Sequence, residues 1–436
     1  MYRYIDYELA HPGASYFGAS NAARLSEIAR CRDPLGVLAT PASSYLYPSE
    51  SKDNAVDILP SDIDIYVGSF SDVISHWRLH SDGSLTFMQS VAAALRNPSW
   101  LVTGAREEIK YMYAVNQVKD ALPNQTIALG VVSSYSVLED GSLRLINSVT
   151  SGGGSPNHAS LSPSEEHIYV ANSCGSVSVH AIDPATGAIE PVPLQIVPLN
   201  NVKEAVKNCE STSFLHQIYI RDANVYVVDR DRDIVTHYKR NPHSGLILTQ
   251  YQDTVSFASG SGPRHLQFHP SGKFAFLISE LANTITVLLV DGSGRLQPAE
   301  KYSTLREGEA AADMAAGEIQ VSRDGRFVYG SNRDLSNPNL NRSSIVVFGF
   351  DAATAGLDIL QHISSGGMHP RHFALFDGAE QRTGWGAVMV VANKDSDSLV
   401  TFVADANDGC LRPTGYAVST LPYHDQPVYV GSASPS

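Results

Sequence analysis

The chain has 436 residues, of which 43% are hydrophobic and 17% are charged, and its formal net charge is -14. This composition supplies enough apolar side chains for a continuous core. The acidic balance, without a basic stripe, argues against a nucleic-acid partner, and no apolar run approaches the roughly 18 residues of a membrane span.

Residues 1–60 do not share the pattern of the rest of the chain. The segment from Ala22 to Arg30 has the pattern of a short helix, and residues 41–60 form a polar connector containing Pro and Ser. We expect an irregular N-terminal extension over residues 1–60, lying outside the folded domain of residues 61–436. A cover over one end of that domain is the alternative.

The cysteines and the N-terminal sequence bear on location. The first ten residues lack the basic start and apolar stretch of a signal peptide. The cysteines show neither a C-x-x-C pair nor a disulfide-framework spacing; they are Cys31, Cys174, Cys209 and Cys410. We therefore expect reduced thiols and a cytoplasmic location.

From residue 61 onward the chain repeats a pattern of short strands. Residues 64–70 and 73–80 have the pattern of two strands, and residues 262–291 hold the clearest copy, with three strands separated by turns. Other copies begin near Pro98, Pro156, Phe214, Gly317 and Pro370. A fourth strand follows each unit, beginning near Leu85, Leu143, Leu246, Leu296, Leu357 and Leu411.

A period of about 50 to 60 residues with four short strands per unit is typical of a β-propeller. Six units have a first strand. Residues 426–431 form a further first strand with no unit after it, whereas residues 64–80 form second and third strands with no first strand before them. We therefore predict an all-β, seven-bladed β-propeller with four antiparallel strands per blade. The C-terminal strand completes the first blade and so removes the open sheet edges.

Antiparallel order also predicts which residues meet. If every first strand starts at one face of the disc, the starts of first strands and the ends of second strands line the same mouth of the channel. The long segments 198–213 and 305–316 lead into first strands and belong at this mouth. The starts supply Asn157, His158, His216, Arg264, His265, Glu318, Arg371 and His372; the ends supply Asn116, Asn172, Asp229, Arg230, Glu280, Asn332, Arg333, Asn393 and Lys394.

This ring is rich in arginine and histidine although the chain is acidic. A guanidinium matches a carboxylate or phosphate through two hydrogen bonds, so the ring predicts a small anionic ligand. Structural roles compete with ligand binding: His265 and His372 are expected mainly to fasten neighbouring blades. For His158 and Arg371 the two roles are equally weighted. Glu280 follows an apolar strand and needs a partner at the channel edge.

Several motifs in residues 262–333 resemble those of the seven-bladed lactonase family, which includes the bacterial propeller-type 6-phosphogluconolactonases and the fungal 3-carboxy-cis,cis-muconate cyclase. The resemblance covers about residues 64–431. The motifs are Gly262-Pro263-Arg264-His265, Phe268-His269-Pro270, Glu280-Leu281, Ala316-Gly317-Glu318-Ile319, Asp324-Gly325-Arg326 and Asn332-Arg333. The residues proposed to act in the cyclase correspond to His216, Arg264, Glu280 and Arg333, all four in the ring predicted from strand direction.

The resemblance implies metal-independent hydrolysis of a small anionic sugar lactone of the 6-phosphogluconolactone type, at the channel mouth and within carbohydrate metabolism. His216 and Glu280 would be the catalytic acid and base, in an order that the sequence leaves open. Arg264 and Arg333 would bind the anion, and His158 and Arg371 are the further substrate-binding candidates. We find no metal-ligand spacing, phosphate loop or Gly-x-Ser-x-Gly motif, and expect neither metal nor cofactor.

Two other functions stay open. In a cycloisomerase of the carboxy-cis,cis-muconate type, a carboxylate of the substrate adds across a carbon-carbon double bond and forms the lactone. Alternatively, the propeller is a non-catalytic binding protein, because the fold alone does not establish activity. The oligomeric state and the exact substrate are not determined by the sequence.

Overall fold

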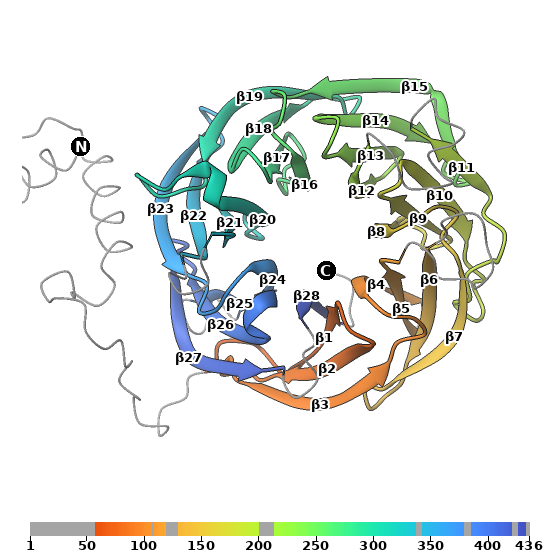
Figure 1. Cartoon of the computed structure of the whole chain (residues 1–436), viewed down its shortest axis with the longest axis horizontal. Coiled ribbons are helices and arrows are strands. Elements are labelled where there is room, and N and C mark those ends of the chain that lie inside the picture. The colour runs from red at the N-terminus through yellow and green to blue at the C-terminus, as the bar shows by residue number, and fades with distance from the viewer. Residues whose placement is uncertain are drawn as a thin grey trace, which may run out of the picture. The chain divides into compact units, whose positions relative to one another are not determined.

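The computed structural model describes residues 57–432, apart from residues 107–108, 119–129, 200–212, 337–341, 379–384 and 421–425. The described residues form seven four-stranded antiparallel sheets arranged around a central axis (Figure 1). The prediction of an all-β, seven-bladed propeller with four antiparallel strands per blade is confirmed. The predicted helix at residues 22–30, and residues 1–56 of the predicted extension, lie outside the described residues.

Each blade runs from an inner strand beside the axis to an outer strand at the rim (Figure 1). Blade 1 contains β28 (Pro427–Ser432), β1 (Ile63–Ser69), β2 (Val73–Leu79) and β3 (Leu85–Ala92). Blade 2 contains β4 (Pro98–Arg106), β5 (Ile109–Asn116), β6 (Val131–Val137) and β7 (Leu143–Thr150). Blade 3 contains β8 (Pro156–Leu161), β9 (His167–Asn172), β10 (Ser176–Ala181) and β11 (Gln195–Pro198).

The remaining four blades follow the same order in sequence. Blade 4 contains β12 (Leu215–Arg221), β13 (Asn224–Asp229), β14 (Ile234–Arg240) and β15 (Ile247–Ser256). Blade 5 contains β16 (Pro263–Phe268), β17 (Phe274–Ser279), β18 (Thr284–Val290) and β19 (Leu296–Ser303). Blade 6 contains β20 (Met314–Val321), β21 (Phe327–Asp334), β22 (Ser344–Asp351) and β23 (Gly356–Ser364), and blade 7 contains β24 (Pro370–Asp377), β25 (Trp385–Asn393), β26 (Ser398–Asp405) and β27 (Leu411–Ser419).

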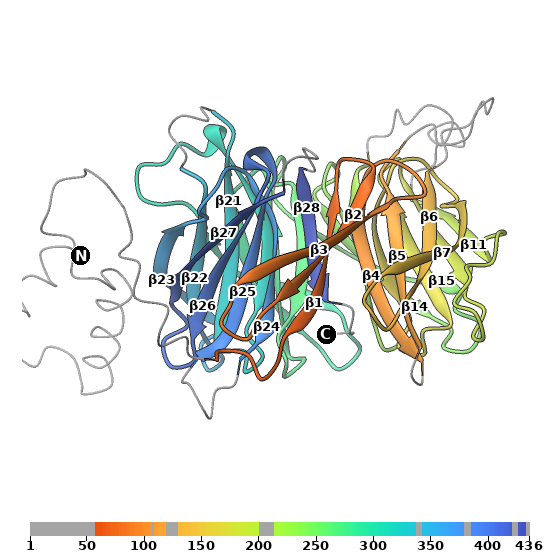
Figure 2. The ribbon, with the colours of Figure 1, turned by 90° about the horizontal axis from the view of Figure 1, so that it is seen from below.

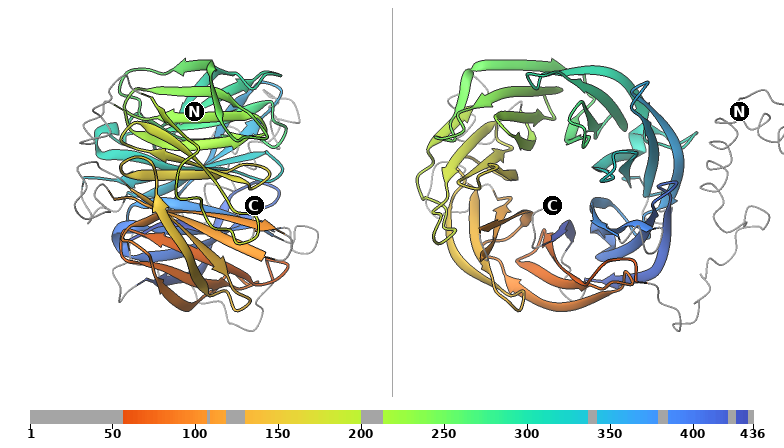
Figure 3. Two further views of the ribbon diagram at one scale, coloured as in Figure 1. Left: turned by 90° about the vertical axis from the view of Figure 1, so that its right-hand side faces the viewer. Right: turned by 180° about the vertical axis from the view of Figure 1, so that it is seen from behind.

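The chain ends close the ring as predicted. The C-terminal strand β28 pairs with β1, with Tyr66 opposite Gly431 and Val67 opposite Val430. The colours in Figure 3 therefore run once around the axis and meet in blade 1. One boundary differs from the prediction, because β20 starts at Met314 rather than at Gly317, preceded by the short 3-10 helix η2 (Ala311–Asp313). A second short 3-10 helix, η3 (Lys394–Ser396), follows β25.

Apolar side chains fill the spaces between blades. For example, Phe276 and Ile278 of β17 pack with Val346 and Phe348 of β22 in one cluster that joins blades 5 and 6. The cluster consists mainly of aromatic and branched aliphatic side chains, and their burial is the main favourable contribution to folding. The ring is therefore a series of cores between blades and not one central core.

Tyrosine hydroxyls add a repeated polar link between blades. Tyr226 on β13 donates to the carbonyl oxygen of Gly294 at 2.7 Å, in the turn between β18 and β19 of the next blade. Gly294 has φ of +88°, a conformation that favours glycine. Equivalent bonds join Tyr66 to Gly141, Tyr169 to Gly245 and Tyr329 to Gly409.

Strand register places the predicted ring at one face. In blade 5, Pro263 at the start of β16 lies opposite Ser279 at the end of β17, and in blade 7 Pro370 lies opposite Asn393. The strands run between the two faces of the disc, as the edge-on view shows (Figure 2). Starts of inner strands and ends of second strands thus share a face, as strand direction predicted.

The prediction of reduced cysteines is wrong for Cys174 and Cys410. Cys174 lies between β9 and β10, Cys410 directly precedes β27, and both are buried and disulfide-bonded. Cys174 belongs to blade 3 and Cys410 to blade 7. A search of the described ranges finds no helix long and apolar enough to cross a membrane.

Candidate active site

Every inner strand contains a β-bulge, at its start in six blades and three residues further on, after Ala316, in blade 6. In blade 5, Pro263 pairs with Ser279 and His265 pairs with Ile278, so Arg264 is an extra residue on its strand. A bulge bends the strand and changes the direction of the side chain that it carries. From blade 1 to blade 7 the extra residues are Val428, Ser99, Asn157, His216, Arg264, Gly317 with Glu318, and Arg371. Three predicted site residues, His216, Arg264 and Arg371, therefore occupy the same structural position.

Glu280 lies among three arginines from three blades. Its Oε1 is 2.9 Å from Nη2 of Arg333, and its Oε2 is 3.7 Å from Nη1 of Arg230 and 3.9 Å from Nε of Arg264. Glu280 directly follows β17, and its own N–H donates to the carbonyl oxygen of Gly262 at 2.6 Å. This backbone bond holds the carboxylate at the end of the second strand.

Backbone carbonyls fix the two most buried guanidinium groups. Arg264 Nη1 donates to the carbonyl oxygen of Gly317 at 2.7 Å, and Arg333 Nη2 donates to that of Ala316 at 2.6 Å. Both arginines are only 2% exposed. The carbonyls come from the bulged start of β20, so the irregular backbone of blade 6 orients charges from β16 and β21.

Two polar atoms in this cluster have no hydrogen-bond partner among the described residues. Arg264 Nε and Glu280 Oε2 are both buried and make no hydrogen bond, and they lie 3.9 Å apart as a long ion pair. Buried polar groups are normally satisfied, and a polar separation of this size accommodates a bridging oxygen. The gap therefore has the donor and acceptor for a water molecule or a ligand oxygen.

The charges set the protonation of the cluster. Burial alone would raise the pKa of Glu280, but Arg333, Arg264 and Arg230 lower it to about 2. Burial and the neighbouring Arg333 lower the pKa of Arg264 to about 10. Burial, with Arg264 and Arg333, lowers the pKa of Arg371 to about 9. At neutral pH the carboxylate is ionised, and the arginines are charged but destabilised by one another, which favours binding of an anion.

Arg371 adds a cation without a matching carboxylate. Its guanidinium lies over the ring of Phe70, 5.1 Å from the centroid. Within the described part of the chain, no carboxylate lies within ion-pair distance of it. Repulsion from Arg264 and Arg333 and the missing counter-charge both suit an anionic ligand.

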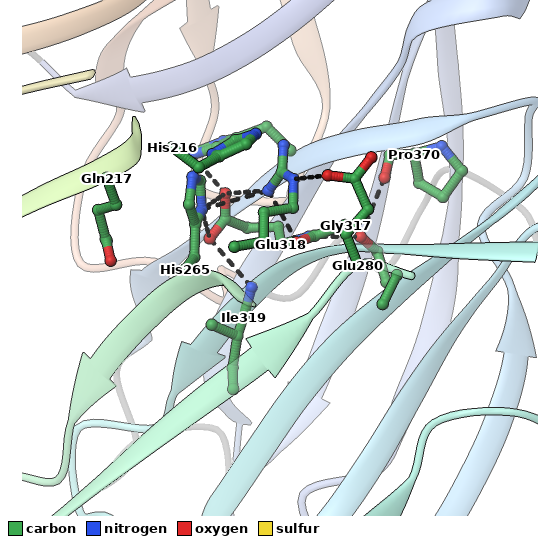
Figure 4. Close-up of polar contacts among 12 residues, drawn as sticks. His216, Gln217, His265, Glu280, Gly317, Glu318, Ile319 and Pro370 are labelled. Carbon is green, nitrogen blue, oxygen red and sulfur yellow. Dashed lines mark hydrogen bonds and ion pairs between the residues drawn. The ribbon is translucent and has the colours of Figure 1, made fainter. Parts of the chain in front are cut away.

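His216, His265 and Glu318 lie together on one side of Glu280, as Figure 4 shows. Burial, followed by Arg264 and His265, keeps the pKa of His216 well below its usual value, so the imidazole is neutral. Its Nδ1 is buried and has no hydrogen-bond partner in the described part. A neutral imidazole with an available ring nitrogen can exchange a proton with a ligand.

Glu318 is a buried carboxylate shared by two histidines. Its Oε1 is 2.9 Å from Nδ1 of His265, and its Oε2 is 3.3 Å from Nε2 of His372. His372 Nδ1 accepts the N–H of Val430 at 3.3 Å, so its Nε2 carries the hydrogen that points to Glu318. The sequence-based expectation that His265 and His372 fasten blades agrees with these contacts between blades 5, 6, 7 and 1.

The structure separates His158 from the other predicted site residues. His158 follows its bulge by one residue, and its ring lies 4.0 Å from that of Trp100 and 5.8 Å from that of His265. Burial and His265 keep its pKa well below the usual value. His158 thus packs among aromatic and histidine rings next to the arginines, and its role in substrate binding stays a prediction.

Sequence reasoning did not select several residues of this region. Trp100 and Tyr429 follow the bulges of β4 and β28, and they carry no charge that would signal a site. His369 lies between Nη1 of Arg333, at 3.4 Å, and Oδ2 of Asp395, at 3.0 Å. Arg230 was placed in the ring but not among the site residues. Trp100 and Tyr429 occupy the same position near the start of an inner strand as His265 and His372, and this shared position was the sequence signal that could have selected them.

A search of the described ranges finds no group of three or more His, Cys, Asp or Glu residues arranged to hold a metal ion.

Comparisons with known proteins agree with this architecture. A family model described as "Lactonase, 7-bladed beta-propeller" matches residues 64–424. The chain is 27% identical over 361 residues to a 6-phosphogluconolactonase of Formosa agariphila, covering 80% of this chain and 94% of that protein. It is 26% identical over 365 residues to a 6-phosphogluconolactonase of Bacillus subtilis, covering 82% and 95%.

A solved structure is similar over nearly its whole length. The periplasmic gluconolactonase of Pseudomonas aeruginosa is 25% identical, with a TM-score of 0.70, and the match covers 85% of this chain and 99% of that one. The relatives support a lactone-hydrolysing enzyme. Because the family model spans most of the propeller, this chain belongs to the lactonase family of seven-bladed β-propellers.

Proposed function

We propose that the protein hydrolyses a small anionic sugar lactone, of the 6-phosphogluconolactone type, at the arginine-rich mouth of the channel and without a metal ion or other cofactor. The observation that carries the proposal is that Arg264 Nε and Glu280 Oε2 make no hydrogen bond and face each other at 3.9 Å. An attacking water fits there, because it can accept a hydrogen bond from the arginine and donate one to the carboxylate.

The arginines provide the binding contribution. Arg333 and Arg371, with the more exposed Arg230, bind the phosphate or carboxylate of the substrate and hold the lactone ring near Glu280. Arg264 lies close enough to Glu280 to donate to the carbonyl oxygen as negative charge develops on it. Donors of this kind contribute about 3 kcal/mol each to the transition state. Orientation of the ring by the anion contributes further.

Glu280 acts as the base in this proposal and His216 as the donor to the leaving oxygen. Glu280 is a weak base in the free protein, since its pKa is about 2. Binding of an anion to the arginines offsets the positive charge that lowers this pKa, so the carboxylate becomes more basic in the complex. His216 is neutral and donates its ring N–H to the departing ring oxygen.

The bonds and protons balance as an ordinary ester hydrolysis. The water oxygen bonds to the lactone carbonyl carbon while one water proton passes to Glu280. The bond between that carbon and the ring oxygen then breaks, and the ring oxygen takes the N–H proton of His216 while Glu280 passes its proton through water to the other ring nitrogen. The imidazole thus stays neutral, the carboxylate is restored, and the product is the open-chain hydroxy acid.

A cycloisomerase of the carboxy-cis,cis-muconate type is the second candidate. It is favoured by the number of cations: Arg230, Arg264 and Arg333 lie within 4 Å of the one carboxylate of Glu280. Arg371 adds a fourth charge that has no carboxylate at ion-pair distance among the described residues, which suits a substrate with two or three carboxylates. The same residues would hold the substrate while one of its carboxylates adds to the double bond. The proton required at carbon would come from His216 or from water.

The test is hydrolysis of freshly generated 6-phosphogluconolactone by purified protein in the presence of a chelator. We compare wild type with Glu280→Gln and Arg264→Ala, and use Glu139→Ala, an exposed site in the turn between β6 and β7, as the control. We expect kcat to fall by about 10²-fold or more in Glu280→Gln, and kcat/KM to fall by about 10²-fold or more in Arg264→Ala.

Each other outcome removes one part of the proposal. Loss of wild-type activity with chelator, restored by a divalent metal, contradicts metal independence. No rate above the spontaneous one, with folded protein, contradicts the substrate, and a carboxylated muconate is then assayed for lactone formation. Inactivity toward both leaves the non-catalytic binding protein.

A further inference from the structure

Trp100 occupies the position after the bulge in β4, and its side chain reaches four other blades. Its ring centroid lies 4.0 Å from His158 in blade 3, 5.5 Å from His265 in blade 5, 5.3 Å from His372 in blade 7 and 4.8 Å from Tyr429 in blade 1. Each of these partners also follows a bulge in its inner strand. We call these five rings the aromatic layer.

The aromatic layer crosses the channel. Blades 2 and 5 are not neighbours in the ring (Figure 1). A side chain of blade 2 that contacts a ring of blade 5 and also one of blade 7 must therefore lie across the axis. The indole of Trp100 therefore occupies the space around the axis at this level.

Residue order along the inner strands gives the depth of this layer. On β16, Arg264 comes first, His265 follows in the aromatic layer, and Gln267 lies further from the mouth. Gln267 lines a separate cavity of about 500 Å³, together with Gln320, Asp324 and Asp377. No residue of the aromatic layer lines that cavity. The layer thus lies between the arginine cluster and the opposite mouth.

We propose that Trp100 forms the floor of the arginine-rich mouth and that the carbon skeleton of the substrate packs on its indole face. Trp100 is half-buried, whereas His158, His265 and His372 are almost completely buried beneath and around it. A flat, partly exposed indole suits a ring or planar skeleton. The identity of the ligand rests on the proposed function, but the position of Trp100 does not.

The substrate class that follows is a small anion whose negative group lies at the edge of a ring or planar carbon skeleton. The anion would bind the arginines while the skeleton covers the indole. A lactone ring with a side-chain phosphate meets this description, and so does a planar carboxylated diene. Inorganic phosphate has the negative charge but no carbon skeleton.

The position of Trp100 is tested without substrate, using charged quenchers of tryptophan fluorescence. The chain has three tryptophans, so the double substitution Trp77→Phe, Trp385→Phe leaves Trp100 alone. If Trp100 faces the arginines, iodide quenches it several-fold more strongly than caesium, although the protein as a whole is anionic. If it faces the opposite mouth, with Asp324 and Asp377, caesium quenches it at least as strongly, and the proposal is overturned.

Two controls keep this test independent of folding defects. The double variant Trp77→Phe, Trp100→Phe retains only Trp385 and gives the quenching of that tryptophan by each ion, so the part of the quenching due to Trp100 in the unsubstituted chain is obtained by difference. The double variant Trp100→Phe, Trp385→Phe retains only Trp77, which is 4% exposed and packs in a core cluster. Its emission serves as the reference for a tryptophan inaccessible to both ions.

Contact with the skeleton is tested by titrating the variant that retains Trp100 with 6-phosphogluconate and with inorganic phosphate, while calorimetry reports binding. We expect 6-phosphogluconate to change the Trp100 emission and phosphate to change it little. We also expect Trp100→Leu to raise KM by about tenfold, with a smaller effect on kcat. Calorimetric binding of 6-phosphogluconate with no change in emission overturns the stacking. No calorimetric binding contradicts the proposed substrate instead, and the quencher experiment still decides the position of Trp100.

Discussion

Glu318 is the residue on which the interior of the site most depends for charge balance. It is 2% exposed, lies within hydrogen-bond distance of His265, and has Arg264 at 3.9 Å. Removing one partner from a buried charged network leaves the others unpaired and costs about 3 to 5 kcal/mol. We therefore expect Glu318→Ala to lower the free energy of unfolding by that amount, measured by urea denaturation.

The matched control for this prediction is Glu307→Ala, which removes an exposed carboxylate. We expect a change within about 0.5 kcal/mol for that substitution. Glu318→Gln keeps the shape of the side chain and should be intermediate. Equal unfolding free energies for Glu318→Ala and Glu307→Ala would show that the carboxylate does not stabilise the network.

The ionisation of Glu280 and His216 predicts the pH dependence of activity. The arginines lower the pKa of Glu280 from 4.5 to about 2, against the effect of burial. A depressed carboxyl pKa means that the ionised form persists as pH falls, until pH approaches the lowered value. Burial lowers the pKa of His216 as well, so it stays neutral over the same range. Neither group titrates in the free protein near neutral pH.

We therefore expect kcat/KM to be flat between about pH 5 and pH 8 for a lactone that carries a carboxylate. With a phosphorylated lactone, a change near about pH 6 is expected from the second ionisation of the phosphate itself. Comparison of the two substrates distinguishes ionisation of groups on the enzyme from ionisation of the substrate. A step near pH 6.5 with the carboxylated substrate would mean that His216 or another group titrates in the free enzyme.

At the level of strands, direction was predictable but local register was not. Alternation and turns predicted the blades, and antiparallel order then grouped Arg264, Glu280 and Arg333 at one mouth. The bulges that bring His216, Arg264 and Arg371 into one layer depend on a one-residue mismatch between paired strands. No local pattern in the sequence specifies that mismatch. Trp100 was missed because its importance arises from contacts across the axis, between residues far apart in the chain.

Closure by β28 carries a prediction about that strand. Val428 and Val430 are buried, and β28 covers one edge of β1. Deleting residues 427–436 exposes the edge of β1 and removes this apolar contact, so we expect aggregation and a lower unfolding temperature. Size-exclusion chromatography and thermal unfolding measure both effects.

A circular permutant provides the control for this deletion. Ser432 at the end of β28 lies opposite Ile65 near the start of β1, so a linker can join β28 to residue 57. New termini then lie between β27 and β28, and residues 1–56 are omitted, whereas Ile58 and Leu59 of the core cluster are kept. If the permutant is folded and monodisperse while the deletion is not, the strand is required and its original connection is not. Equal stability of both variants would mean that blade 1 does not need β28.

For the molecule as a whole, the cysteines connect the fold to its compartment. The cytoplasmic location proposed from the sequence rested on reduced thiols, whereas Cys174 and Cys410 are disulfide-bonded in the structure. Disulfides persist mainly in oxidising compartments. We expect alkylation of the denatured, unreduced protein, followed by peptide mass spectrometry, to leave Cys174 and Cys410 unmodified, and alkylation after reduction to modify both. Cell fractionation of the native source should then place the protein in an oxidising compartment. Free thiols at both positions without reductant would support the cytoplasmic prediction instead, because the pairing would then be absent from the protein in solution.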